Sequence, residues 1–245
     1  MLPVFIKPEW PAPARVKALT TSRIGGVSQT DFSSLNIATH VGDKVCAVDA
    51  NRKIVCNSLN LPAKPQWLEQ VHGKELVYLD GIDTSRIIKA DAAFTHNTGV
   101  VCTVMTADCL PVLLCKQDGT AVAAIHAGWR GLLAGIIEKT VAKITEPEIL
   151  LAWLGPAIGP GRFEVGVEVK DAFVDKSVVM QQAFRQIAPQ HYLADLYALA
   201  RMVLIQQGVK MIYGGEHCTY NEKDKFYSYR RQPKTGRMAS LIWLE

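Results

Sequence analysis

Three short segments place an imidazole or a thiol beside small or turn-forming residues. They are residues 70–73 (Gln-Val-His-Gly), 106–109 (Thr-Ala-Asp-Cys) and 126–131 (His-Ala-Gly-Trp-Arg-Gly), and their candidate ligands are His72, Cys109 and His126. Two imidazoles and one thiolate suit a borderline ion such as zinc, with copper as the other choice. Three protein ligands leave a fourth position open, as a catalytic metal requires. The segments therefore predict a catalytic metal site, if the fold brings them together.

The separations between the three residues match no local zinc-finger pattern, so spacing alone leaves two alternatives. In the first, Cys109 is a buried thiol and both histidines are structural loop residues. In the second, the site holds no metal and works as a Cys-His hydrolase, with Cys109 as the nucleophile and His126 or His72 as the base.

Two arginines are candidates for binding an anion. Arg23 precedes the glycine pair Gly25-Gly26, and this combination can present backbone donors and a guanidinium fork to phosphate or carboxylate. Arg130 follows His126 at the expected start of a helix, where free amide groups also favour an anion. The alternatives are a surface arginine before a turn for Arg23 and a solvated charge for Arg130.

Carboxylates among apolar neighbours need partners, which draws attention to Asp91 and Asp108. We expect Asp108 to orient a ligand histidine or to act as a catalytic acid or base. The alternative is a turn aspartate that bonds its own backbone. Residues 226–231 could offer aromatic rings to a base and cations to an anion, although such strands usually lie in a core.

The hydrophobic pattern predicts the elements that must position these residues. We expect strands at 100–105, 110–115, 121–125 and 149–154, and a helix carrying the apolar positions between Leu132 and Val141. A second helix should start after Asp195 and stop at Gly208. Further strands are expected at 163–169, 209–213, 226–229 and 238–244. Because strands and helices do not alternate strictly, the fold class is a mixed α/β (α+β) layered sandwich with mixed sheets.

Composition limits the class of protein. A chain of 245 residues, 49% of them hydrophobic and 20% charged, can form one domain over residues 1–245. The net charge of +4 is mild and scattered, which argues against nucleic acid as a partner. No segment has the length and apolarity of a signal peptide or a membrane span. The six cysteines lack the spacing of a secreted scaffold, so we expect reduced thiols and a cytoplasmic location.

The same segments resemble the YfiH-like family, also labelled polyphenol oxidase or laccase-domain proteins. The resemblance covers nearly the whole chain and implies an α-β-β-α sandwich in which His72, Cys109 and His126 hold zinc or copper. We expect Cys109, His126 and Asp108 to be catalytic and Arg23, Ser28, Asn36 and Arg130 to bind substrate or phosphate. The matching blocks are residues 21–28, 34–36, 40–43, 67–73, 90–92, 106–111, 126–131, 155–166 and 226–244.

The resemblance also implies an activity, the phosphorolysis of purine nucleosides (adenosine, inosine and methylthioadenosine) together with deamination of adenosine. The older label implies phenol oxidation by copper, but a multicopper centre needs more imidazoles than six histidines can provide. Some bacterial relatives are associated with editing of peptidoglycan precursors, which matches the Cys-His hydrolase alternative. A binding module without catalysis is the remaining class. We expect a purine nucleoside and phosphate as small-molecule partners, in a monomer or a homodimer.

Overall fold

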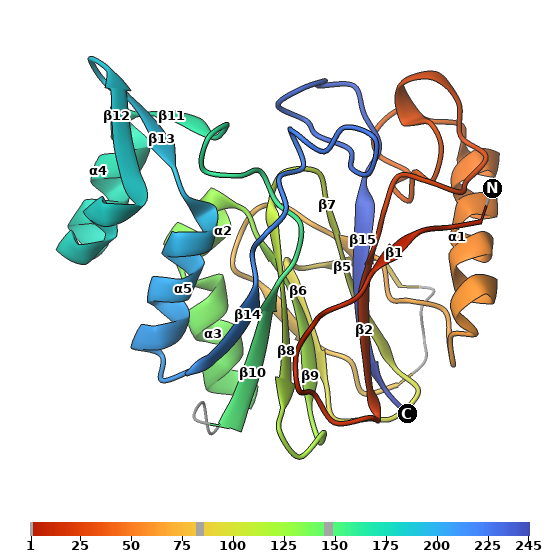
Figure 1. Ribbon diagram of the computed structural model, residues 1–245. Coiled ribbons are helices and arrows are strands. Elements are labelled where there is room, and N and C mark those ends of the chain that lie inside the picture. Colours follow the sequence, from red (N-terminus) through yellow and green to blue (C-terminus); the bar gives the residue numbers. More distant parts are fainter. Residues whose placement is uncertain (1, 82–85, 145–148) are drawn as a thin grey trace.

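Two β-sheets face each other at the centre of the molecule (Figure 1). The computed structural model describes residues 2–81, 86–144 and 149–245. The smaller of the two sheets is antiparallel and has the order β1-β2-β15-β7. Its strands are β1 (Phe5–Ile6), β2 (Val16–Thr21), β15 (Met238–Leu244) and β7 (Val101–Thr106).

The larger sheet is mixed and has the order β14-β10-β8-β9-β6-β4. The pairs β10–β14 and β4–β6 are parallel, and the other pairs are antiparallel. Its strands are β14 (Met211–Gly214), β10 (Leu150–Leu154), β8 (Leu110–Lys116), β9 (Val122–Ala127), β6 (Ala92–Thr95) and β4 (Leu76–Tyr78).

Strand β9 shows why the larger sheet is apolar on both faces. Val122 and Ala124 pack toward the smaller sheet, whereas Ala123 and Ile125 pack toward the helices on the other side. Successive side chains of a strand point to opposite faces, so a sheet that is covered twice needs an unbroken apolar run. This explains why the strand predictions at 100–105, 110–115, 121–125, 149–154 and 238–244 were correct within one or two residues.

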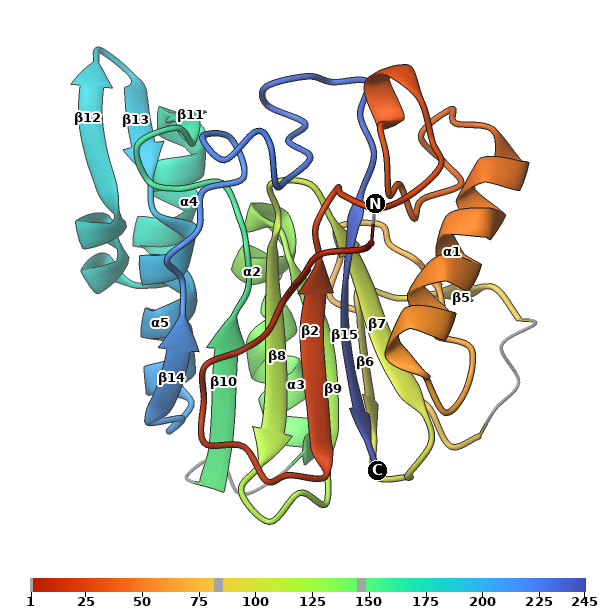
Figure 2. The same cartoon turned by 45° about the vertical axis from the view of Figure 1, so that its right-hand side comes forward.

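Helices cover the two outer faces and complete four layers (Figures 1 and 2). Helix α1 (Val45–Leu59) packs on the smaller sheet through Val55, against Leu19 and Leu241. Helices α2 (Trp129–Ala134), α3 (Ile136–Ile144) and α5 (Leu196–Gln206) pack on the larger sheet. The predicted α-β-β-α sandwich with mixed sheets is confirmed.

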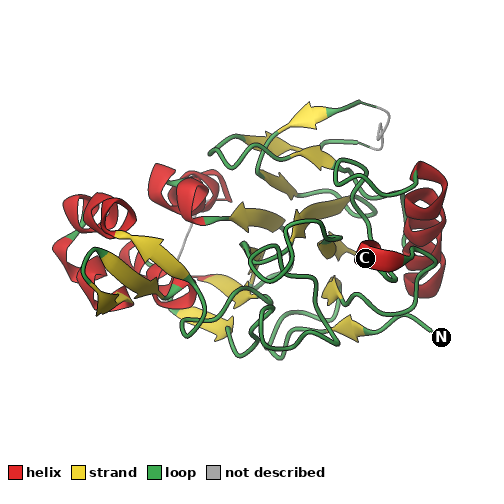
Figure 3. Ribbon diagram, turned by 90° about the horizontal axis from the view of Figure 1, so that it is seen from above, coloured by secondary structure: helices red, strands yellow, loops and turns green. Residues whose placement is uncertain are grey.

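Shorter elements surround the sandwich (Figure 3). A three-stranded sheet of order β11-β13-β12 lies beside α4 (Val167–Lys176) and the 3-10 helix η3 (Val178–Ala183). Its strands are β11 (Glu164–Gly166), β13 (His191–Ala194) and β12 (Phe184–Ala188). The described residues also form a parallel pair, β3 (Leu68–Glu69) and β5 (Ile88–Lys89), and the 3-10 helix η1 (Thr30–Phe32).

Three predicted elements differ from the structure, and one cap is confirmed. The helix expected between Leu132 and Val141 is two helices, because Gly135 adopts a left-handed φ of 94° that ends α2. The strand expected at 163–169 gives way to α4 after Gly166. Residues 226–229 form no strand but a loop with buried aromatic rings. The side chain of Asp195 caps α5 as predicted, by accepting the N–H of Ala198 at 2.9 Å.

Across the described ranges, no helix combines the length and the apolar composition needed to span a bilayer. All six cysteines are free thiols, and three of them, Cys102, Cys109 and Cys115, lie on or beside the two central sheets.

Candidate active site

Three different elements carry the predicted ligands to one end of the sandwich. His72 lies in the loop that follows β3, and His126 is the penultimate residue of β9. Cys109 lies in the bend between β7 and β8, which belong to different sheets, so the chain crosses from one sheet to the other at this residue. Because Pro111 of β8 pairs with His126 of β9, Cys109 comes to lie beside the end of β9.

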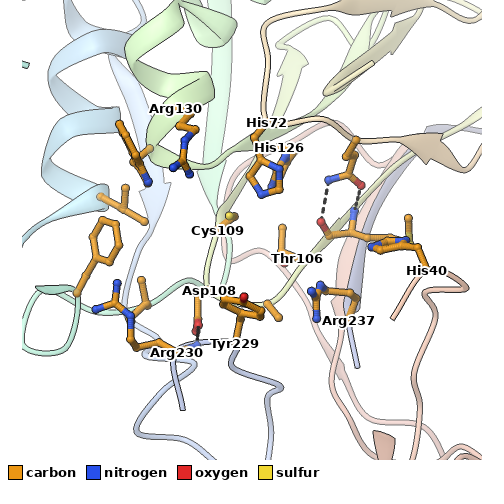
Figure 4. A pocket seen from close by; sticks show the side chains of 17 residues that line it. His40, His72, Thr106, Asp108, Cys109, His126, Arg130, Tyr229, Arg230 and Arg237 are labelled. Carbon is orange, nitrogen blue, oxygen red and sulfur yellow. Dashed lines mark hydrogen bonds between the residues drawn. The ribbon is translucent and has the colours of Figure 1, made fainter. Parts of the chain in front are cut away.

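The candidate ligand atoms of His72, Cys109 and His126 all lie within 4.8 Å of one another. The two imidazole rings meet edge to face, with centroids 4.8 Å apart and an interplanar angle of 79°. A single ion can bridge this spacing, since zinc–nitrogen and zinc–sulfur bonds are about 2.0–2.3 Å long. Figure 4 shows the three side chains converging at the edge of a cavity. The donor set therefore fits one zinc or copper ion with a further coordination position open to the cavity.

Asp91 holds two of the three ligands in place. Its Oδ1 atom lies 2.8 Å from Nδ1 of His126 and accepts the backbone N–H of His72 at 2.9 Å. Its Oδ2 atom accepts the N–H groups of Gly73 and Val71 at 2.8 and 3.2 Å. The bond to Nδ1 leaves Nε2 of His126 free to face a metal, an arrangement common in histidine metal sites. Asp91, not Asp108 as predicted, orients the ligand histidine.

The backbone around the ligands is unusual. His72 and Asp108 both have left-handed φ angles, of 60° and 85°, which L residues adopt at a cost. Gln70 holds the His72 loop against β7, because its side chain donates to the carbonyl of Met105 and accepts the N–H of the same residue, at 2.8 and 2.7 Å.

Gly128 leaves room for the Cys109 side chain, since a Cβ at this position would lie 2.9 Å from Sγ of Cys109.

The pKa values of the site follow from these contacts. Burial would raise the pKa of Cys109, but the charge of His126 and hydrogen bonds from both ligand histidines lower it to about 6. Burial would lower the pKa of His126, but the Cys109 thiolate and Asp91 raise it to about 9. Burial would also raise the pKa of Asp91, but hydrogen bonds from His126 and the backbone hold it below its usual range. Without metal, the site is thus a thiolate–imidazolium pair.

A cavity of about 520 Å³ opens beside the ligands. One part of its wall is apolar or aromatic, and another part is polar or cationic. The lining residues are His40, Gln70, His72, Met105, Thr106, Ala107, Asp108, Cys109, His126, Trp129, Arg130, Ile158, Phe163, Leu196, Tyr229, Arg230 and Arg237. Its size and mixed lining suit a ligand as large as a nucleoside.

Asp108 lines this cavity, but its carboxylate is occupied by protein donors. Oδ1 accepts the hydroxyl of Thr219 at 2.6 Å, and Oδ2 accepts the hydroxyl of Ser228 at 3.0 Å and the backbone N–H of Arg230 at 2.7 Å. These bonds attach the loop that carries Tyr229 and Arg230 to the residue next to Cys109. The geometry favours a positioning role for Asp108 over the predicted catalytic one.

Arg23, Ser28 and Asn36 are absent from the described residues that line the cavity. Arg23 donates to the carbonyls of Ser33 and Lys223 at 2.9 and 3.0 Å. The hydroxyl of Ser28 and the amide of Asn36 both donate to Oδ2 of Asp43, at 2.6 and 2.9 Å.

Asn36 nevertheless reaches the cavity indirectly, because its Oδ1 accepts the backbone N–H of the lining residue Arg237 at 3.0 Å.

Arg130, which we expect to bind substrate or phosphate, lines the cavity, and so do two residues that the sequence analysis did not single out, Arg237 and His40. Arg237 had no local signal beyond its place in a matching block, and His40 stood in another such block. Burial, followed by the charges of Arg237 and Arg52, lowers the pKa of His40. Tyr229 and Arg230 belong to the segment considered for base and anion contacts, and both reach the cavity.

The chain is similar to a described protein family, to named bacterial proteins and to solved structures. The model of a family described as "Multi-copper polyphenol oxidoreductase laccase" matches residues 17–245. The "Purine nucleoside phosphorylase YfiH" of Shigella flexneri is 53% identical over 98% of both chains, and "Purine nucleoside phosphorylase PA4543" of Pseudomonas aeruginosa is 51% identical over 98% of both. The crystal structure of Neisseria meningitidis protein NMB0706 superposes with a TM-score of 0.93 at 50% identity, covering 98% of this chain and 99% of that one. YlmD from Geobacillus stearothermophilus gives a TM-score of 0.85 at 30% identity, covering 95% and 93%.

Proposed function

Because the chain belongs to the YfiH-like, laccase-domain family, whose relatives named above carry the name purine nucleoside phosphorylase, we propose that it is a metal-dependent enzyme of this kind. Its substrates are adenosine, inosine and methylthioadenosine with phosphate, and it also deaminates adenosine. One observation carries the proposal: the triad of His72, Cys109 and His126 opens onto a nucleoside-sized cavity whose arginines form no ion pair with the described residues.

His72, Cys109 and His126 would hold zinc, or copper in its place, since imidazole and thiolate suit both. When bound, the ion would supply a Lewis acid at the edge of the cavity. Asp91 keeps Nε2 of His126 turned toward the ion, and Gly128 keeps space beside Cys109.

Phosphorolysis needs an anion site and a place for the base. Arg237 is half-buried, and its described contacts include two backbone carbonyls, of Thr235 and Gly236, but no carboxylate. Arg237 forms no ion pair with a described residue, although the charges of Cys109 and Asp108 act on it, so its guanidinium can still bind phosphate. His40 lies in the same part of the cavity. The aromatic residues Trp129, Phe163 and Tyr229 offer faces on which a purine can stack.

The bonds that change are few. An oxygen of phosphate forms a bond to C1′ of the ribose while the bond from C1′ to N9 of the purine breaks. The electron pair stays on N9, which takes up a proton, and the products are ribose 1-phosphate and the free base. The sugar is cation-like between these events, so an anion near C1′ stabilises it. In deamination, water adds at C6 of adenosine and ammonia leaves, giving inosine.

The geometry argues against a multicopper centre, and metal analysis separates the proposal from a Cys-His hydrolase. Three of the six histidines (His40, His72 and His126) line the cavity, and the described residues contain a single group able to hold a metal, which suits one ion and not a multicopper centre. A Cys-His hydrolase would use the Cys109 thiolate as a free nucleophile. Stoichiometric metal in the purified protein would contradict that alternative, because the metal would occupy the thiolate.

Product chromatography tests the proposal. Zinc-loaded protein is incubated with adenosine, with and without phosphate, beside a Cys109→Ala variant. Adenine and ribose 1-phosphate that require phosphate and disappear in the variant would support the phosphorylase. Inosine formed without phosphate would support deamination alone, and the absence of any product from adenosine would overturn the proposal.

A further inference from the structure

The cationic side chains of the cavity form two groups. In Figure 4, Arg237 and His40 lie on one side of the metal-ligand triad, and Arg130 and Arg230 lie on the other. The second pair shares its side of the cavity with Trp129 and Phe163, which carry the rings on which the two guanidinium groups stack. A single inorganic phosphate ion can contact only one of these two groups. The presence of the other cationic group therefore needs a separate explanation.

Arg130 and Arg230 lack a counter-ion among the described residues. Neither forms an ion pair there, and Asp108 is the acidic side chain in the cavity lining. Its carboxylate meets the backbone N–H of Arg230 and the hydroxyls of Thr219 and Ser228 instead. The charge of the two guanidinium groups therefore stays available to a ligand.

Stacking orients both groups. The guanidinium carbon of Arg130 lies 4.3 Å from the centroid of Trp129, and that of Arg230 lies 5.4 Å from the centroid of Phe163. A ring beside a guanidinium group uses none of its N–H groups as conventional hydrogen-bond donors, so N–H groups remain for phosphate oxygens. Arg230 is further held by its bond to the carbonyl of Glu164 at 2.9 Å.

A neutral nucleoside with inorganic phosphate offers only one anion to these two groups. We propose that Arg130 and Arg230 bind the phosphate ester of a purine nucleoside monophosphate, so that the cavity accepts a substrate that carries its own anion. This inference rests on the proposed function, in which Arg237 and His40 receive inorganic phosphate. The aromatic rings beside Arg130 and Arg230 then lie where the nucleoside part of the same molecule can stack.

Binding measurements without turnover test this inference. Because the proposed deamination would consume adenosine, calorimetric titration of zinc-loaded protein compares inosine, inosine 5′-monophosphate and inorganic phosphate, each added alone, in the wild type, Arg130→Ala and Arg230→Ala. We expect the monophosphate to bind about tenfold or more tightly than inosine, and each variant to reduce this ratio by about tenfold, as expected for losing a charged hydrogen bond. Arg162→Ala is the matched control, because Arg162 is exposed and stacks on Tyr220 outside the cavity. It should leave the ratio unchanged.

Two results would overturn the inference. The first is equal affinity of the wild type for inosine and its monophosphate. The second is a loss of affinity for inorganic phosphate alone in Arg130→Ala and Arg230→Ala, which would make this pair the site of the free ion. The proposed function is tested by a different measurement, the phosphate-dependent products of adenosine. Whether or not those products form, the titrations show whether Arg130 and Arg230 bind the monophosphate.

Discussion

Oδ1 of Asp91 lies 2.8 Å from Nδ1 of His126, and both side chains are buried. The same carboxylate accepts three consecutive backbone N–H groups from the loop that contains His72. One side chain thus sets the ring orientation of one candidate ligand and the position of another. Residues that hydrogen-bond metal ligands usually affect metal affinity strongly, and their mutation weakens binding or activity.

Asp91→Asn should weaken zinc binding by about 10–100-fold, because the amide cannot accept the imidazole N–H and the backbone donors at once. Competition with a chromophoric chelator measures the affinity. Asp80→Asn, at an exposed position on the surface, is the control and should bind zinc like the wild type. Equal affinity in both variants would show that Asp91 does not support the site.

Gly128→Ala should lose most bound metal and most activity while keeping the fold. The added Cβ would lie 2.9 Å from Sγ of Cys109 and 3.4 Å from Cδ2 of His72, so at least one ligand must move. Gly161→Ala is the matched control, because an added Cβ there has no heavy atom within 4 Å. Metal analysis after gel filtration, with circular dichroism for the fold, compares the two; full metal content in Gly128→Ala would refute the packing argument.

Zinc affinity should depend on pH in a defined direction. Binding requires a Cys109 thiolate and a neutral His126. Because the pKa of Cys109 is lowered to about 6 and that of His126 is raised to about 9, binding between these values expels the proton of His126, and binding below pH 6 expels a second one from Cys109.

The apparent affinity should therefore rise about tenfold per pH unit from pH 6 to 9 and more steeply below pH 6. Chelator competition in a series of buffers measures this slope. An affinity that stays constant between pH 6 and 8 would mean that the thiolate–imidazolium pair does not form.

Asp108→Asn should distinguish positioning from acid–base catalysis. Asparagine tolerates the left-handed φ of 85°, so the substitution mainly removes one acceptor from the bonds to Thr219, Ser228 and the Arg230 backbone. We expect KM for the nucleoside to rise about tenfold, from a loss of roughly 1–2 kcal/mol, with little change in kcat. A large fall in kcat and a lost limb of the pH–rate profile would instead identify Asp108 as the acid or base.

Alanine variants of Arg23 and Arg237 should differ in their effects on phosphate binding and on stability. Arg237→Ala should raise KM for phosphate by about tenfold or more, since a charged hydrogen bond is lost. Arg23→Ala should leave that KM unchanged and lower Tm by a few degrees, because it removes two bonds to backbone carbonyls and the stacking on Tyr227 at 4.8 Å. A raised KM for phosphate in Arg23→Ala and an unchanged KM in Arg237→Ala would instead indicate that phosphate binds at Arg23.

The sequence by itself determined the layered α/β class and the three candidate ligands. Apolar runs such as those around Cys109 and His126 are dictated by burial on both faces of a sheet, and that signal is local. The cap at Asp195 is local for the same reason, since its partner is three residues away. Imidazole and thiolate are metal ligands in any fold, which made His72, Cys109 and His126 candidates, and the family resemblance favoured a metal site over structural roles for them.

The tertiary structure alone decided which side chains surround those ligands. Asp91 and Asp108 have similar apolar neighbours in the sequence, yet one bonds His126 and the other bonds a loop more than a hundred residues away. Arg23 lies in the more suggestive motif, but Arg237 reaches the cavity. These choices depend on strand register and on how distant loops fold against each other, and a hydrogen bond between remote segments leaves no periodic pattern in either of them.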